Sequence, residues 1–394
     1  MSDLFLTGIG QLTTNTGSPI TDAVVAIEKG KITYAGPAVD APDQTGERYD
    51  CEGMAVIPGF VDAHTHLIFA GDRSDEFARR LAGESYQEIA AAGGGILSTV
   101  AATRASSENE LYELAAARVW RMIRTGTTTV EIKSGYGLDM ETELRQLAVA
   151  RRVGEELPVT VKSTFLGGHS VPPEFEKDRE GYVDLLVEEM LPAAAPLSDY
   201  CDVFVEDGVF SVDEARGIFT KGAELGLGAR VHAEQLGHSG GAALAAEIGA
   251  VSADHLDHVS EDEARALAEA EVSAVLVPGA SYTLRSPQAP GPMLLEKGCT
   301  VALATDCNPG TSFFESMPPI LSLAVVQMGL TVDQAITAAT LGGARSLGFD
   351  DRGYIAPGSV ADLVVLDAPS AAHLAYRPGA NLVRQVIKGG VPVG

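Results

Sequence analysis

The stretch that decides the fold is VDAHTHL, residues 61–67, which places His64 and His66 directly after a run of apolar residues. That run, AVIPGFV at 55–61, is short and rich in β-branched residues, which predicts a buried strand. Side chains two positions apart on a strand point to the same side, so both imidazoles can reach one point. Neutral imidazole suits zinc and iron equally well. We interpret the pair as metal ligands, with two surface histidines spaced by chance as the alternative until further ligands are found.

Seven further apolar runs follow, each ending in polar residues and each followed by a segment of helical character. They lie at residues 127–133, 159–165, 203–206, 229–232, 250–255, 272–277 and 300–306. Eight strands alternating with helices over roughly 250 residues predict an α/β protein with a (β/α)8 barrel of the TIM type, whose active sites lie at the carboxyl ends of the strands. His64 and His66 then end strand 1, His232 strand 5, His255 strand 6 and Asp306 strand 8. All five side chains are expected at the same mouth.

The two ends of the chain predict a smaller β domain beside the barrel. Alternating apolar residues around the turn KGK at 29–31 are typical of a β-hairpin, and similar strands return at 358–367 and 383–393. Because each set has too few strands to fold alone, we expect both to pair in one β-sandwich; two unrelated tails are the alternative. The predicted division assigns residues 1–56 and 355–394 to the β-sandwich and residues 57–354 to the barrel.

Composition and charge limit the partners of the chain. Its 394 residues, 45% of them hydrophobic, suffice for one barrel and one smaller domain. The formal net charge of -26 argues against nucleic acid, whose phosphates bind Lys and Arg. The start of the chain lacks the basic region of a secretory signal, and the longer uncharged stretches are interrupted by polar residues, Gly or Pro, so we expect a cytoplasmic protein with no membrane partner. Four scattered cysteines without a CxxC pattern argue against disulfides and cysteine zinc sites.

Several motifs resemble a known family. The stretch PGFVDAHTH at 58–66 is similar to the opening motif of the amidohydrolase superfamily, whose barrels bind metal through residues on strands 1, 5, 6 and 8. Four more stretches resemble the branch of that superfamily that opens the ring of 4-imidazolone-5-propanoate in histidine degradation. These are KSGYGL at 133–138, VHAEQ at 231–235, SADHL at 252–256 and ATDCNPGT at 304–311. The resemblance covers essentially the whole chain, and it implies hydrolysis of that cyclic amide to N-formimidoyl-L-glutamate.

The resemblance also implies a catalytic metal centre. Its expected ligands are His64, His66, His232 and Asp306, and this set of three nitrogens and one oxygen leaves a position open for water. One zinc or iron ion per chain would lower the pKa of that water toward about 7. Asp306 would then take the proton, with His255 assisting at the oxyanion or the leaving nitrogen. A two-metal centre that includes Glu206, near the end of strand 4, is the alternative.

The expected substrate is a small anion, and the resemblance assigns the residues that contact it. Arg73, seven positions after His66, can present a planar fork to a carboxylate. Some family members carry a glutamate at the position of Gln235; glutamine can hydrogen-bond the ring but cannot exchange a proton, so we expect it to bind rather than to catalyse. The overall negative charge opposes an anionic substrate, so a local cation must attract it. The expected contacts are Arg73, Tyr136, His169, Gln235, Asn308, Gly310 and Thr311.

Two other functions compete with this interpretation. A sibling hydrolase with the same barrel, acting on a nucleobase or on another cyclic amide, is disfavoured by Arg73 and Tyr136, since a neutral purine needs no carboxylate clamp. A non-catalytic binding barrel would be expected to have lost ligands, and all four are present. We further expect a homodimer, a hinge or lid at AAGGGI, residues 91–96, and no role in the site for His238, His258 and His373.

Overall fold

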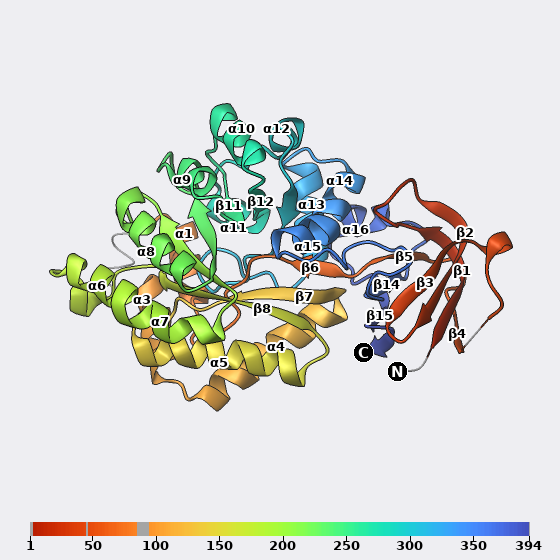
Figure 1. Ribbon diagram of the computed structural model, residues 1–394, viewed down its shortest axis with the longest axis horizontal. Coiled ribbons are helices and arrows are strands. Elements are labelled where there is room, and N and C mark those ends of the chain that lie inside the picture. The colour runs from red at the N-terminus through yellow and green to blue at the C-terminus, as the bar shows by residue number, and fades with distance from the viewer. Residues whose placement is uncertain (1–2, 45, 85–93, 394) are drawn as a thin grey trace.

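The computed structural model describes residues 3–44, 46–84 and 94–393 and arranges their strands in two sheets (Figure 1). One sheet contains eight parallel strands, and the other is a mixed sheet that lies to one side of it. The described helices are α1 Ser74–Leu81, α3 Ile96–Ala105, α4 Glu108–Arg124, α5 Met140–Glu156, α6 Arg179–Leu185, α7 Leu191–Ala194, α8 Val212–Glu224, α9 Gly241–Glu247, α10 Glu261–Glu269, α11 Pro278–Leu284, α12 Gly291–Glu296, α13 Met317–Val326, α14 Val332–Thr337, α15 Gly343–Ser346 and α16 Ala372–Tyr376, with short 3-10 or π turns at Ala38–Asp40, Pro173–Phe175, Leu186–Met190, Ala195–Leu197 and Ala338–Gly342.

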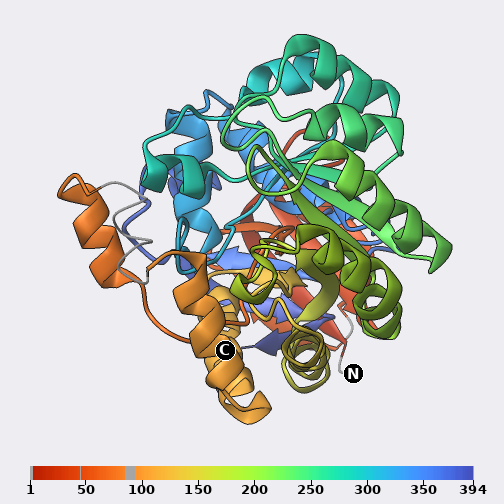
Figure 2. The same ribbon diagram turned by 90° about the vertical axis from the view of Figure 1, so that its left-hand side faces the viewer.

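The parallel sheet confirms the predicted barrel. Its strands are β6 Phe60–Asp62, β7 Thr127–Lys133, β8 Thr160–Gly168, β9 Tyr200–Val205, β10 Gly228–Ala233, β11 Ser252–His255, β12 Ser273–Leu276 and β13 Val301–Leu303. Each pairs with its neighbour in chain order. Helices surround the strands in the end view of Figure 2. The predicted runs match because a strand buried on both faces reads as a short, continuous apolar segment.

The barrel closes just beyond its first and last strands. The N–H of Asp306 donates to the carbonyl of His64 at 3.0 Å, and the N–H of His66 donates to the carbonyl of Cys307 at 3.1 Å. Thr65 and Cys307 form a parallel bridge between these two segments. Expected metal ligands therefore lie on the seam of the barrel.

The prediction of one continuous strand at 55–61 is wrong, because the chain changes sheets in the middle of this run. Residues Ala55–Pro58 form β5 of the mixed sheet, and β6 begins at Phe60. At Gly59, between them, a Cβ atom would lie 2.4 Å from the hydroxyl oxygen of Thr128. Only glycine fits at this close approach, and hydrophobicity alone does not reveal the change.

The mixed sheet joins both ends of the chain, as predicted. Its strands are β1 Leu4–Leu12, β2 Ile20–Glu28, β3 Lys31–Pro37, β4 Glu47–Asp50, β5, β14 Leu363–Leu366, β15 Val383–Lys388 and β16 Val391–Val393. Strand β14 pairs antiparallel with β5, so N-terminal and C-terminal strands share one sheet (Figure 1). Leu6, Ile27, Leu363 and Ile387 pack in one apolar cluster of this unit.

Two of the long helices that cover the barrel begin at a capping box. Ser107 before α4 and Ser211 before α8 each form a capping box with a glutamate three residues later.

Of the predicted lid at 91–96, residues 91–93 lie outside the described part of the chain, and Ile96 begins α3. Within the described residues, every helix is too short or too polar to cross a bilayer.

A buried carboxylate joins the two strands at the seam. Asp62, at the end of β6, accepts hydrogen bonds from the N–H of Thr305 at 2.9 Å and from its hydroxyl at 2.7 Å. The side chain is fully buried, and burial raises the pKa of Asp62 to about 7. These bonds connect strand 1 to strand 8 immediately below the residues that carry the expected ligands.

We predict that Asp62→Ala lowers the free energy of unfolding by about 2–4 kcal/mol, because it breaks both hydrogen bonds and leaves the buried N–H of Thr305 without an acceptor. Asp62→Asn is the matched control, since its amide can accept from the N–H and donate to the hydroxyl. Denaturant unfolding of the two variants measures the difference. Equal stability of the two variants would show that the seam does not depend on these bonds.

Candidate metal and substrate site

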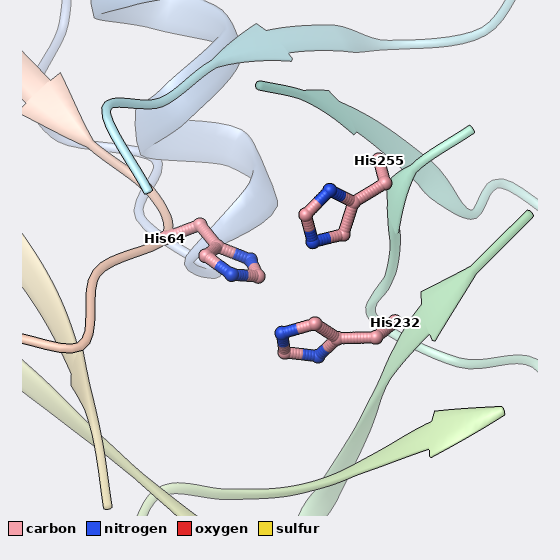
Figure 3. Close-up of side chains that lie close together, drawn as sticks. All are labelled: His64, His232 and His255. Atoms are coloured by element: carbon pink, nitrogen blue, oxygen red, sulfur yellow. The ribbon is translucent and has the colours of Figure 1, made fainter. Parts of the chain in front are cut away.

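The strand ends bring together five residues that the sequence singled out. His64 and His66 follow β6, His232 lies in β10, His255 ends β11 and Asp306 follows β13. All five are at most 2% exposed. The imidazoles of His64, His232 and His255 point toward one another in Figure 3. The predicted common mouth is therefore present.

The ligand atoms form two overlapping groups. In the first, Nε2 of His64 lies 3.2 Å from Nε2 of His66, and both lie 3.5 Å from Oδ1 of Asp306. In the second, His64 gathers with His232 and His255; within each group the ligand atoms lie within 4.8 Å of one another. The predicted ligand set is thus divided between the two groups, with His64 shared. Sequence spacing did not reveal this division.

Burial keeps the imidazoles neutral. It lowers the pKa values of His64, His66 and His232 well below their usual range and that of His255 to about 4. Neutral imidazole is the form that binds metal. Burial also raises the pKa of Asp306 well above its usual range, an effect that a bound cation would oppose.

Several buried ring nitrogens fit a metal ion. Among the described residues, Nε2 of His232 and Nδ1 of His255 have no hydrogen-bond partner; Nδ1 of His66 has none either, but the nitrogen of that ring that faces Asp306 is Nε2. Buried polar atoms in folded proteins are nearly always paired, so such atoms call for another explanation. Nitrogen donors gathered with one carboxylate suit zinc or iron.

Carboxylates stand behind two of the histidines. Oδ2 of Asp254 lies 2.7 Å from Nδ1 of His64, and Oδ2 of Asp202 lies 2.9 Å from Nδ1 of His232. A carboxylate at Nδ1 favours the tautomer with its proton there, which leaves Nε2 free to bind a metal. The hydrogen bond to Asp254 orients the His64 ring, whereas Asp202 faces His232 without the geometry of a hydrogen bond.

A layer of buried charges below the histidines was not predicted from the sequence. Nζ of Lys133 lies 2.8 Å from Asp202, 2.9 Å from Glu131 and 3.5 Å from Asp254, and Nη2 of Arg230 lies 3.3 Å from Asp254. All five side chains are buried, and three carboxylates face two cations. The excess negative charge favours a cation above it. In the sequence, this layer could have been inferred from charged residues that lie inside otherwise apolar strands.

Tyr136 and His169 join the histidine cluster, as expected. The His169 ring stacks on that of His66 with centroids 5.0 Å apart, and Tyr136 lies 5.3 Å from His169 and 5.8 Å from His66. Both side chains lie where they can contact a ring held at the cluster.

Asn308 organises the loop that leaves β13. Its Oδ1 accepts the N–H groups of Gly310 and Thr311, each at 2.8 Å, and its Nδ2 donates to the carbonyl of Asp306. A cavity of about 830 Å³ lies beside this loop, lined by Arg73, Gly310 and Thr311 among others. Three of the expected substrate contacts therefore share one cavity.

The guanidinium group of Arg73 is already paired within the chain. Its Nε and Nη2 donate to the carboxylate of Glu76, at 3.0 Å and 2.5 Å. The fork that the sequence assigned to a substrate carboxylate is thus already paired within the chain. In the sequence, this pairing could have been inferred from the glutamate three positions after Arg73.

The side chain of Glu206 contacts the backbone of Gln235. Oε1 of Glu206 accepts the N–H groups of Gln235 at 2.6 Å and Leu236 at 2.8 Å, so it holds the loop after β10. The clusters of metal-binding geometry found within residues 3–44, 46–84 and 94–393 do not include Glu206. This arrangement gives no support to a two-metal centre that uses Glu206.

The backbone turns sharply where the strands end. His255 and Asp306 have φ angles of 78° and 50°, in the left-handed region that residues other than glycine rarely adopt. Such conformations persist only where the surrounding structure enforces them, and they are frequent at functional sites.

Comparisons with known proteins agree with this geometry. The sequence model of the amidohydrolase family matches residues 55–393. Proteins named imidazolonepropionase from Symbiobacterium thermophilum and Salinispora tropica are both 48% identical to this chain; the alignments cover 98% and 100% of it and 96% and 99% of the relatives. A triazine hydrolase variant has the same fold, with a TM-score of 0.77, 18% identity and coverage of 99% of this chain and 94% of that one. So does an adenosine deaminase from Xanthomonas campestris with bound zinc, with a TM-score of 0.71, 22% identity and coverage of 99% and 92%.

We predict that Asp254→Asn weakens metal binding by about 10-fold to 100-fold, because the amide no longer fixes the tautomer of His64. Asp199→Asn is the control, since Asp199 pairs with Lys162 at the amino end of β9. Competition with a chelator measures the affinity of each metal-depleted variant. Equal affinities in the two variants would show that the carboxylate behind His64 has no influence on the metal.

Proposed function

This chain belongs to the amidohydrolase family, in its imidazolonepropionase branch, and from that premise we propose that it hydrolyses the cyclic amide of 4-imidazolone-5-propanoate. The product would be N-formimidoyl-L-glutamate, in L-histidine degradation. The observation that carries the proposal is a cluster of neutral histidines and one aspartate at the mouth of the barrel, in a chain that is 48% identical over nearly its whole length to proteins named imidazolonepropionase. The small-anion substrate agrees with arginines beside the cavity.

We propose one zinc or iron ion per chain, held by His64, His66, His232 and Asp306. The neutral imidazoles, their unpartnered nitrogens and the carboxylates behind two of the rings support this assignment. When bound, the ion would lower the pKa of a water molecule and polarise the ring carbonyl. The two overlapping groups, which share His64, favour a two-metal centre as the alternative.

The side chains of the site supply the proton transfers. Asp306 is the proposed base, which accepts a proton from the water whose oxygen bonds to the carbonyl carbon of the ring. His255, as the neutral imidazole, is proposed to donate a hydrogen bond to the developing oxyanion, and the proton taken up by Asp306 passes to the leaving nitrogen as the carbon–nitrogen bond breaks. Tyr136 and His169 would orient the ring, and Gln235, Asn308, Gly310 and Thr311 are the remaining proposed contacts.

Metal analysis and turnover together test the proposal. Elemental analysis of the purified protein should find about one metal per chain, and the protein should convert freshly prepared imidazolone propanoate to N-formimidoyl-L-glutamate. Two metals per chain would favour the two-metal alternative. Bound metal without turnover would contradict the proposed substrate and favour a sibling hydrolase. Dimerisation and a cytoplasmic location stay predictions from the sequence.

We predict that Asp306→Ala lowers kcat by about 100-fold to 10,000-fold, which is the usual contribution of a positioned base. The substitution removes a proposed metal ligand and the proposed proton acceptor together. Asp306→Asn separates these roles, since its amide oxygen can still approach a metal but cannot accept the proton. Steady-state kinetics and metal content are measured for both variants, with thermal unfolding as the check on folding. Near-normal activity in the asparagine variant would exclude Asp306 as the base.

A further inference from the structure

We propose that Arg80 is a second anion-binding residue of the active site, which together with Arg73 holds the carboxylate of the substrate and determines specificity for anions. This inference rests on the proposed function, and it names a residue that the sequence motifs did not single out. It starts from the side chains of α1, the helix beside the cavity.

Arg73 alone has one free donor edge. Its Nε and Nη2 are engaged by Glu76, and Glu76 is fixed in turn because its Oε2 accepts the N–H of Gly95 at 2.8 Å. The remaining nitrogen, Nη1, faces Gly310: a Cβ atom on that glycine would lie 2.5 Å from it. Arg73 can therefore meet a substrate carboxylate through its Nη1–Nη2 edge alone, unless Glu76 is released.

Arg80 lies on the same face of α1, two turns after Arg73. Its Nη1 donates to the carbonyl of Gly310 at 3.3 Å, so both guanidinium groups adjoin the same glycine at the cavity wall. Its Nε and Nη2 are buried and have no hydrogen-bond acceptor within the described chain. Buried donors of a charged group are costly to leave unpaired. Arg80 does not itself line the cavity, so a carboxylate placed beside Gly310 would satisfy these donors once the guanidinium group turns toward it.

The charges near Gly310 favour an anion. Three guanidinium groups, of Arg73, Arg80 and Arg285, and two carboxylates, of Asp72 and Glu76, lie at or beside this cavity, in a protein whose formal net charge is -26. Burial lowers the pKa of Arg80; Glu76 opposes this effect, and Arg73 adds to it. The local excess of positive charge provides the attraction that an anionic substrate needs against the overall field.

The neighbouring arginine provides a matched comparison. Arg79 pairs with Glu84 through Nε at 2.9 Å and Nη2 at 2.6 Å, and its side chain is 37% exposed. Arg79→Met and Arg80→Met change the net charge equally, and methionine has nearly the helix propensity of arginine. A difference between the two variants therefore reports the position of the arginine and not the total charge.

Steady-state kinetics with 4-imidazolone-5-propanoate is the first test. Arg80→Met should raise KM by about 10-fold to 100-fold, the usual effect of losing hydrogen bonds to a charged group, with a much smaller change in kcat. Arg80→Lys should recover part of the loss, and Arg79→Met should keep the KM of the unmodified protein. The neutral propanamide counterpart of the substrate should show no such difference between Arg80→Met and Arg79→Met. Circular dichroism and thermal unfolding check that every variant folds.

A binding measurement separates this inference from the proposed reaction. Imidazole propanoate carries the carboxylate but has no cyclic amide, so its affinity is measured by calorimetry without turnover. Weaker binding in Arg80→Met than in Arg79→Met supports the anion site, even if the unmodified protein hydrolyses no imidazolone and the proposed function fails. Equal binding and equal KM in the two variants would overturn the inference. A fall in kcat alone, with KM and affinity unchanged, would also overturn it.

Discussion

The site depends on the buried charges that lie inside the barrel below the histidines. Burying a charged side chain costs several kcal/mol unless opposite charges and hydrogen bonds surround it. Lys133 meets that condition by contacting carboxylates from three strands, and Arg230 adds contacts to Asp254 and to the carbonyls of Ala63 and Ser346. A shift of one residue in any of these strands would turn a charge toward the apolar helices. The same contacts that fix the register also place Asp202 behind His232 and Asp254 behind His64, two of the proposed metal ligands.

The protein separates its overall charge from the charge of its site. The formal net charge of -26 favours solubility, whereas the guanidinium groups of Arg73 and Arg80 both adjoin Gly310, where we propose that the carboxylate of the substrate binds. Glu76 holds Arg73 in a fixed position and so reduces the side-chain freedom that would be lost on binding. The cost of this arrangement is that the fork of Arg73 is already paired. Arg80, with unpaired donors beside the same glycine, fits as the complementary cation.

The sequence predicted the barrel and the location of its site because both follow from simple regularities. Apolar runs mark strands buried on both faces, and residues that end parallel strands reach one mouth, which placed His64, His232 and Asp306 together. The change of sheet at Gly59 was missed because it depends on a contact with Thr128, distant in the chain. Lys133 and its partners were missed because their pairing depends on side-chain direction in four strands. The division of the ligands into two groups depends on rotamers that spacing does not specify.

The seam of the barrel and the metal site are made of the same residues. The backbone of Asp306 bonds to that of His64, and the backbone of His66 bonds to that of Cys307, so the barrel closes through the segments that present the ligands. The bonds of Asp62 to Thr305 stabilise this closure before any metal binds, and the closed seam in turn holds Asp306 in its left-handed conformation. A cation bound across the seam would interact with the closed barrel and not with an opened one. By mass action, metal binding must then stabilise closure by as much as closure strengthens metal binding.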